Sequence, residues 1–416
     1  MFYIYKCLTN LLYPIIILII FFRKILNKEE KNRYKEKLFI SSFNIKRKFK
    51  KLIWIHAASI GEVKSVIPVI NKLDSKNNIE FLITSITISS AKLIEKEFKS
   101  RKNIHHRFMP FDKVNLVKNF LSGWSPNLVL FVDSEIWPNF IFEIKKNKIP
   151  LVLLNARITN KTFKRWSKFK ENSAKIFAKI DMAFTQNEET SQFLKKLGVK
   201  KIKYIGNLKY FEDKKIKNDE IEGKLKSKFE KYKICVAAST HDNEEFFAAK
   251  THILLKKKIN KLITVIIPRH IDRVNKINNQ LKNLNLKTVY HSSKINNLDN
   301  IDIYIVDTFG DSKKFYKIAT TVFLGGSIVE KGGQNPLEPA RYGAKILHGP
   351  NVHNFREVYN FLRLLKISKQ IKSSSQFAKE IVFKKKMKNV KKIKKVGDRI
   401  FKNTFENLNM IINHET

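Results

Sequence analysis

Cysteine is nearly absent from this 416-residue chain, which contains only Cys7 and Cys235. The two residues lie far apart and neither belongs to a CxxC pair, so a disulfide framework and a cysteine-based zinc site are both excluded. We therefore expect a reducing compartment and no structural zinc. No group of histidines and carboxylates has metal-site spacing either, and the adjacent His105 and His106 are expected to lie in a solvated loop.

The phosphate-binding motifs of two large enzyme classes are also missing. The chain has no G-x-x-x-x-G-K-S/T loop and no G-x-G-x-x-G after its first strand, which disfavours nucleoside triphosphate hydrolysis and dinucleotide redox chemistry. It has no internal repeat and no long low-complexity linker. With 43% hydrophobic residues it is too long for one ordinary core, so two domains of α/β size are expected.

Acidic residues are scarce, with 37 Asp and Glu against 82 Lys and Arg, and the formal net charge is +45. A strongly basic chain first suggests a nucleic-acid partner. Lysine is, however, scattered through nearly every segment together with asparagine and isoleucine, which indicates a compositional bias of the whole chain and not a basic stripe on one face. An anionic membrane or an anionic substrate would suit such a chain equally well.

An apolar segment stands at the start of the chain. The run from Leu11 to Phe22 extends weakly back to Phe2 and is followed by a basic stretch from Arg23 to Lys37. The segment is just long enough to span a bilayer, and it has no small-residue cleavage site. We expect residues 1–30 to form a membrane anchor or interfacial helix, with the rest of the protein on the cytoplasmic side. An ordinary buried helix is the alternative.

Strand-like and helix-like segments alternate through the rest of the chain, which predicts parallel sheets with helices on both faces. A first series has expected strands at 52–57, 81–84, 128–132, 151–155 and 182–185, and expected helices at 61–73, 91–98 and 138–145. A second series, after the Gly206-Asn207 turn, has expected strands at 234–237, 262–267, 288–291, 303–306, 322–324 and 345–347.

The charged segment 211–233 separates the two series, so we place a domain boundary near Gly206. The predicted fold is α/β, with two Rossmann-like domains that face each other across a cleft and ligands at the carboxyl ends of the strands. The domains are predicted over residues 31–206 and 207–385. The basic segment 386–416 is predicted to be a C-terminal helix.

The most informative segment lies between residues 325 and 350, where a glycine-rich turn opens a helix between two apolar strands. Asn335 and Pro336 make a good helix start, and the helix is predicted to run through Leu337 and Glu338. A helix N-terminus approached by glycines collects unpaired N–H donors and partial positive charge, so we predict a phosphate site here. The alternative is a tight crossover that binds nothing.

Three carboxylates follow strands of the first series. Glu62 falls on the first turn of a helix, where the helix dipole favours its ionised form, and it is well placed as a general base. A capping interaction with Ser59 is the alternative. Asp133 and Glu135 follow a strand of Leu, Val and Phe, where carboxylates could hold a sugar hydroxyl or stabilise positive charge. A helix cap by Asp133 is the simpler role for one of these two.

Polar residues also follow two strands of the second series. Pro268, Arg269 and a histidine come after one strand, and a turn that ends at Asp311 comes after another. Arg269 offers planar donors suited to a phosphate or a carboxylate. Asp311 could accept a hydrogen bond from a ribose hydroxyl. For the Pro-Arg-His triplet, a loop without function is the alternative.

Read together, six motifs resemble the lipid A 3-deoxy-D-manno-octulosonic acid (Kdo) transferases and occur in the order of that family. The resemblance covers nearly the whole chain, including the apolar N-terminus. The motifs are Trp-Ile-His-Ala-Ala-Ser-Ile-Gly-Glu (54–62), Ser-Glu-Ile-Trp-Pro-Asn (134–139), Gly-Asn-Leu-Lys (206–209), Ala-Ser-Thr-His (238–241), Pro-Arg-His (268–270) and Gly-Gly-Gln-Asn-Pro-Leu-Glu-Pro-Ala (332–340).

The resemblance implies a GT-B glycosyltransferase that moves Kdo from CMP-Kdo to the lipid A precursor, lipid IVA, at the cytoplasmic face of the inner membrane. It implies inversion at the anomeric centre, no metal, no other cofactor and no nucleic-acid partner. By motif, Glu62 matches the general base, and Glu135 and Lys209 match positions of transition-state stabilisation. The CMP-binding segments match Pro268, Arg269, Phe309, Gly310, Asp311, Asn335, Pro336, Leu337 and Glu338.

The chain departs from the family pattern at four places. Asp311 stands where glutamate is usual, Gln334 where histidine is common and Ala156 where glycine is common. We expect activity to survive these changes. The segment 84–90 lacks the usual glycine, which puts the acceptor side in question.

Two other functions remain open at this stage. A GT-B sugar-nucleotide epimerase would share the phosphate-binding half but would need no membrane segment. A basic nucleic-acid-binding protein would leave the glycine-rich turn and Glu62 unexplained.

Overall fold

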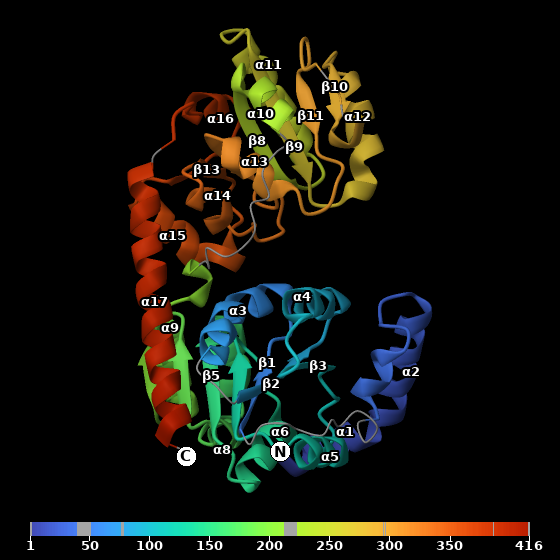
Figure 1. Ribbon diagram of the computed structural model, residues 1–416, viewed down its shortest axis with the longest axis vertical. Coiled ribbons are helices and arrows are strands. Elements are labelled where there is room, and N and C mark those ends of the chain that lie inside the picture. Colours follow the sequence, from blue (N-terminus) through green and yellow to red (C-terminus); the bar gives the residue numbers. More distant parts are fainter. Residues whose placement is uncertain are drawn as a thin grey trace. The chain divides into compact units, whose positions relative to one another are not determined.

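The computed structural model describes residues 2–39, 51–75, 79–211, 223–293, 295, 297–385 and 387–414. Its contacts divide the chain into two compact units, the first comprising Met1–Asp213 with Val396–Thr416 and the second Lys214–Lys395. Each unit contains one parallel sheet of seven strands (Figure 1). The expected α/β class with two parallel sheets is confirmed.

The sheet of the first unit has the strand order β3-β2-β1-β4-β5-β6-β7. Its strands are β1 (Lys51–His56), β2 (Ile79–Ser85), β3 (Ile104–Phe108), β4 (Leu128–Val132), β5 (Leu151–Ala156), β6 (Met182–Thr185) and β7 (Ile202–Tyr204). The helices between them are α3 (Ile60–Asp74), α4 (Ile88–Phe98), α5 (Val114–Trp124), α6 (Pro138–Lys146), α7 (Asn160–Ser167), α8 (Lys170–Phe177) and α9 (Glu188–Leu197). A short 3-10 helix, η3 (Leu208–Tyr210), follows β7.

The central strands of this sheet are apolar on both faces because helices cover both faces. Alternate residues of β1 enter different cores, with Trp54 on one side and Ile53 and Ile55 on the other. Trp54 packs against Phe120 and Phe140 in the first core. This two-sided burial holds the strand ends in place, and the polar residues of the site follow those ends.

His105 and His106 lie within β3, so the expected solvated loop is wrong. His106 Nε2 lies 2.9 Å from Ser85 Oγ, and the Arg33 guanidinium contacts both Nδ1 and the carbonyl oxygen of His106. The sequence Ile-His-His-Arg-Phe has few apolar residues because β3 is an edge strand that is only partly buried.

The N-terminal apolar segment forms two helices, α1 (Phe2–Leu11) and α2 (Tyr13–Ile25). Among the described residues no single helix is both long and apolar enough to cross a membrane, whereas Ile4–Leu11 and Tyr13–Ile25, bent by 48°, pass that test as a pair. Several large apolar side chains of these helices are exposed, among them Leu11 (76%) and Phe22 (61%).

The sheet of the second unit has the order β10-β11-β9-β8-β12-β13-β14. Its strands are β8 (Lys233–Thr240), β9 (Leu262–Pro268), β10 (Thr288–Tyr290), β11 (Ile303–Ile305), β12 (Thr321–Leu324), β13 (Lys345–His348) and β14 (Ser368–Gln370). Its helices are α10 (Gly223–Glu230), α11 (Glu244–Lys256), α12 (Val274–Lys282), α13 (Ser312–Ile318), α14 (Leu337–Arg341), α15 (Arg356–Leu364) and α16 (Ser374–Glu380).

The last helix, α17 (Met387–His414), begins in the second unit and continues into the first. In the first unit Ile400, Leu408 and Ile412 join the core beneath β1. The same stretch lies against the turn that carries Lys209, because Ile400 contacts Gly206 and Phe401 stacks on Phe211 with ring centroids 4.1 Å apart.

Candidate active site

Glu62 lies at the start of α3, directly after β1. Ser59, the N-cap residue of α3, accepts a hydrogen bond from the Glu62 backbone N–H (3.4 Å) and donates its hydroxyl to Glu62 Oε1 (2.7 Å). The backbone N–H of Ala58 donates to Glu62 Oε2 (2.8 Å). The capping interaction proposed as an alternative is therefore present, and it fixes the direction in which the carboxylate points.

The environment of Glu62 also changes its acidity. Burial raises the pKa of Glu62, the Ser59 hydrogen bond opposes this effect, and the negative charges of Asp133 and Glu135 reinforce it. The side chain remains partly exposed. A reachable carboxylate with a raised pKa is a stronger base than an ordinary glutamate, so capping and proton transfer are compatible roles.

Glu135 has the opposite character. Trp137 Nε1 donates to Glu135 Oε2 (2.7 Å), and Nε2 of the buried His56 lies 3.3 Å from the same oxygen. Burial works against the charge of Glu135, but the bonds from His56 and Trp137 outweigh it and lower the pKa. Glu135 is therefore held as an anion beside a carboxylate that binds protons more readily, a contrast typical of divided catalytic roles.

Asp133 does not cap a helix, so that expectation is wrong. Trp137 is the N-cap residue of α6, and Asp112 accepts from the first backbone N–H groups of the helix instead. Asp133 Oδ2 lies 3.6 Å from Lys209 Nζ and accepts a bond from Gln186 Nε2 (3.4 Å). Asp133 has a left-handed backbone, with φ of 66°, which is uncommon for a residue other than glycine.

Lys209 is held by amide side chains that follow neighbouring strands. Asn207 Oδ1 accepts from the Lys209 backbone N–H (2.9 Å), and Asn207 Nδ2 donates to Gln186 Oε1 (2.8 Å). Asn155 Oδ1 accepts from the backbone N–H next to Lys209 (2.9 Å). A Cβ built at Gly61 would lie 4.0 Å from Lys209 Cε, so the lysine reaches the start of α3.

The first unit thus brings Glu62, Glu135 and Lys209 to one edge of its sheet. They follow β1, β4 and β7, respectively. Asn155 in β5 and Gln186 after β6 hold the turn that carries Lys209. Sequence reasoning missed His56, Asn155 and Gln186. Each is a polar residue at the end of an apolar strand, the same signal that identified the carboxylates.

In the second unit an internal carboxylate occupies part of the glycine-rich turn. The buried Glu244 accepts backbone N–H bonds from Gly326 (2.7 Å), Ser327 (3.0 Å) and Ile328 (2.9 Å). The N–H of His241 donates to the same carboxylate (3.0 Å). These donors are satisfied within the protein, so a phosphate at this turn would depend on the residues beyond them.

The later part of the turn forms the expected helix start. Asn335 Oδ1 accepts from the Leu337 backbone N–H (3.1 Å), as expected of an asparagine at a helix start, but Pro336 and not Asn335 is the N-cap residue. The helix that follows, α14, has only five residues. A helix of little more than one turn offers only a small partial positive charge at its N-terminus. Cationic side chains would have to supply most of the positive charge for an anion.

Such side chains lie at the carboxyl ends of β8 and β9. Arg269 follows β9, and its backbone N–H donates to the carbonyl oxygen of Thr240 at the end of β8 (3.0 Å). The rings of His241 and His270 have centroids 5.8 Å apart. Burial lowers the pKa of His241, and the positive charges of Lys331 and Arg269 act in the same direction. The cluster favours an anionic ligand.

The predicted segment Phe309 to Asp311 follows β11. Phe309 is 91% exposed, and Gly310 has φ of 94°, a backbone conformation that favours glycine. Asp311 Oδ1 pairs with Lys314 Nζ (2.8 Å), and Asp311 Oδ2 accepts from the Thr308 hydroxyl (2.5 Å). The ribose contact expected of Asp311 would have to share the carboxylate with these partners.

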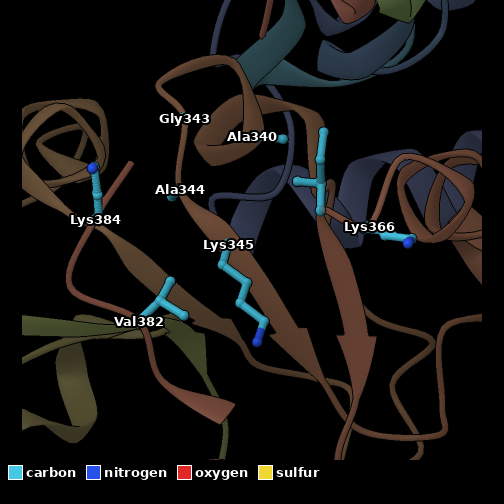
Figure 2. A pocket seen from close by; sticks show the side chains of 8 residues that line it. Ala340, Gly343, Ala344, Lys345, Lys366, Val382 and Lys384 are labelled. Atoms are coloured by element: carbon cyan, nitrogen blue, oxygen red, sulfur yellow. The ribbon is translucent and has the colours of Figure 1, made fainter. Parts of the chain in front are cut away.

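Figure 2 shows a small pocket in the second unit. Its lining includes Ala344, Lys345 and Ile367, which stand at the amino ends of β13 and β14. Ligands of parallel α/β sheets bind at the carboxyl ends, and Lys345 is already paired with Glu380 (2.9 Å). We assign no function to this pocket.

Within the described ranges, no three His, Cys, Asp or Glu side chains are grouped to hold a metal.

The fold defines the class of the protein. The solved structure of UDP-GlcNAc 2-epimerase from Neisseria meningitidis matches 88% of this chain and 100% of its own, with a TM-score of 0.56 and 12% sequence identity. Identity this low establishes the fold alone. The chain is thus a two-domain α/β protein with a GT-B-like fold.

The family follows from sequence. The family model for 3-deoxy-D-manno-octulosonic-acid transferase (kdotransferase) matches residues 32–212. A 3-deoxy-D-manno-octulosonic acid transferase from Rickettsia bellii is 34% identical over 84% of this chain and 82% of its own length. The Rickettsia typhi relative of the same name is 37% identical over 72% of this chain, which spans 64% of that relative. This chain belongs to the 3-deoxy-D-manno-octulosonic acid transferase family.

Proposed function

We propose that this protein transfers Kdo from CMP-Kdo to a lipid A precursor. The observation that carries the proposal is the cluster of Glu62, Glu135 and Lys209, which combines two carboxylates of opposite pKa shift with one ammonium group at a single sheet edge. Membership in the transferase family supports the donor and the acceptor class.

In this mechanism Glu62 removes the proton from an acceptor hydroxyl while the hydroxyl oxygen attacks the anomeric carbon of Kdo. The bond from that carbon to the phosphate oxygen breaks, CMP leaves with the electron pair, and a single displacement inverts the centre. Glu62 then releases its proton to solvent. The raised pKa of Glu62 supports the role of base, because the proton must be bound before it is released.

Glu135 and Lys209 would act on charge that develops during the reaction. The anomeric carbon becomes positive as CMP departs, and an anion fixed by His56 and Trp137 stabilises that charge without having to reorient. Lys209 offers positive charge to the carboxylate of Kdo or to the departing phosphate. Its attachment through Asn207 keeps it beside the carboxylates.

The second unit would hold CMP. Arg269 and its cationic neighbour Lys331 favour the phosphate, and no metal is required for that charge. The Asn335 to Glu338 turn would add backbone donors. The exposed ring of Phe309 offers an apolar surface to the base or the ribose.

We further propose that the protein works at the cytoplasmic face of the inner membrane. The exposed apolar side chains of α1 and α2 support contact with lipid, and the basic residues that follow support contact with anionic headgroups.

The decisive experiment incubates purified protein with CMP-Kdo and a tetraacyl lipid A precursor and measures CMP release and the lipid mass. We expect Glu62→Gln to lower kcat about 10²–10⁴-fold while CMP still binds, because general bases contribute that much to the rate. Glu188→Gln, which alters an exposed glutamate in the first turn of α9, serves as the matched control.

A wild-type kcat in Glu62→Gln would show that Glu62 is not the general base. No lipid product from the wild-type protein, under conditions in which another family member works, would refute the proposed function. Conversion of UDP-GlcNAc in place of Kdo transfer would favour an epimerase, the activity of the structural neighbour.

A further inference from the structure

The helix that follows Glu135 does not cap its own N-terminus. Helix α6 starts at Pro138, and Trp137 at the N-cap position makes no side-chain hydrogen bond to the helix. Trp137 instead donates its indole N–H to Glu135. The position of the α6 start therefore determines where the indole, and with it the Glu135 carboxylate, can lie.

Asp112, from the loop before α5, supplies the missing cap. Its Oδ2 accepts from the Asn139 backbone N–H (3.1 Å) and its Oδ1 from the Phe140 backbone N–H (2.9 Å). The carbonyl oxygen of Asp112 also accepts from Asn139 Nδ2 (2.6 Å). Asp112 and Asn139 are both fully buried, so these bonds are not exchanged for water.

The N-terminal apolar helix contacts the same cap. The hydroxyl of Tyr5 on α1 donates to Asp112 Oδ2 (2.8 Å), and Asn139 Nδ2 donates to Thr9 Oγ1 (3.3 Å). Two side chains of α1, separated by about one helical turn, thus contact the two residues that form the cap. In Figure 1 α1 lies beside the start of α6.

We propose that Tyr5 and Asp112 are positioning residues for Glu135, through which the placement of α1 sets the geometry of the active-site loop. Without the Tyr5 hydroxyl, Asp112 Oδ2 loses one of its two donors and the cap weakens. The start of α6 then gains freedom, and so does the Trp137 indole that holds Glu135.

The same arrangement links the active-site loop to a lipid surface. Ile4, Leu8 and Leu11 on α1 are exposed, while Tyr5 and Thr9 of the same helix contact the cap. A lipid that binds the apolar side of α1 would favour the placement in which Tyr5 reaches Asp112. This inference rests on the proposed function for its catalytic readout and on the proposed membrane contact for its lipid.

The test compares Tyr5→Phe with the full-length wild-type protein in two measurements. Amide hydrogen exchange of the peptide containing Asn139 and Phe140 needs no substrate, and we expect about tenfold faster exchange in the variant. In the transfer assay we expect kcat to fall about tenfold while the KM for CMP-Kdo is unchanged. Tyr13→Phe is the matched control, because its hydroxyl on α2 donates to the carbonyl oxygen of Leu38 and not to the cap.

Wild-type exchange at Asn139 and Phe140 would overturn the proposal. Faster exchange with an unchanged kcat would overturn it as well, because the cap would then be structural only. If the wild-type protein transfers no Kdo, the proposed function fails, and the exchange measurement alone decides whether α1 positions the α6 start.

Discussion

Gly397 of α17 packs so closely against the Lys209 turn that any side chain there should disturb the site. A Cβ at Gly397 would lie 2.4 Å from the carbonyl oxygen of Tyr210, 2.8 Å from its carbonyl carbon and 3.0 Å from Phe211 Cα. Ordinary contacts begin at 3.4 Å, so Gly397→Ala must separate the helix from the turn by about 1 Å. Tyr210 directly follows Lys209, so the turn cannot move without the lysine.

The stability and the activity of Gly397→Ala should respond differently. Overpacking costs about 1–3 kcal/mol, and the better helix propensity of alanine returns about 1 kcal/mol, so the free energy of unfolding should fall by about 0–2 kcal/mol. A displacement of about 1 Å at a catalytic group can cost about a hundredfold in rate. We therefore expect kcat to fall about ten- to a hundredfold.

Urea unfolding and the transfer assay measure the two effects. Asn403→Ala, at an exposed position of the same helix, is the control and should leave kcat within about twofold of wild type. If Gly397→Ala keeps the wild-type kcat and is more stable by about 1 kcal/mol, helix propensity alone explains it, and the close approach has no role in placing Lys209.

Two further predictions concern buried titratable side chains. Burial, Arg33 and Arg107 lower the pKa of His106 to about 3, so the folded protein leaves it neutral while the unfolded chain protonates it below pH 6.5. The free energy of unfolding therefore falls as the pH falls, by about 1.4 kcal/mol at pH 5.5, because protons bind the unfolded chain. In urea unfolding, His106→Gln should lose less stability than wild type between neutral pH and pH 5.5. An equal loss in the two proteins would contradict this prediction. Glu244→Gln should lower the free energy of unfolding by about 2–4 kcal/mol and weaken CMP binding in calorimetry. The reason is that the buried backbone N–H groups of Gly326 and Ser327 share two carboxylate oxygens, of which glutamine keeps one. Wild-type stability of the variant would show that the turn does not need the carboxylate.

Apolar runs located the central strands, and the strands that escaped sequence analysis are edge strands. β3, β7 and β14 stand at sheet edges and are only partly buried, so their sequences need no continuous apolar run. A strand of Ile-Lys-Tyr or Ser-Lys-Gln carries no pattern that separates it from a loop. Pairing with a neighbouring strand defines these segments, and that information is not local.

The candidate site divides in the same way. Glu62 and Glu135 could be predicted because each follows an apolar strand, and parallel strands place their carboxyl ends at one edge. The partners that define their chemistry are distant in sequence. His56 reaches Glu135 from β1, and Asp112 caps α6 from another loop. No local pattern marks either contact, and the expected cap by Asp133 was wrong for that reason.

The whole chain is strongly positive, whereas the carboxylates outnumber the lysine at the candidate site of the first unit. The two charges therefore act differently on an anionic donor. A net charge of +45 attracts an anionic sugar nucleotide and an anionic lipid surface from a distance. At the sheet edge, Glu62, Asp133 and Glu135 would repel the same donor, and Lys209 offsets only part of that repulsion. Under the proposed function, Arg269 and Lys331 would supply most of the attraction for the donor. Weakening those cations should raise the KM for CMP-Kdo more than it lowers kcat, whereas changes at the carboxylates should lower kcat.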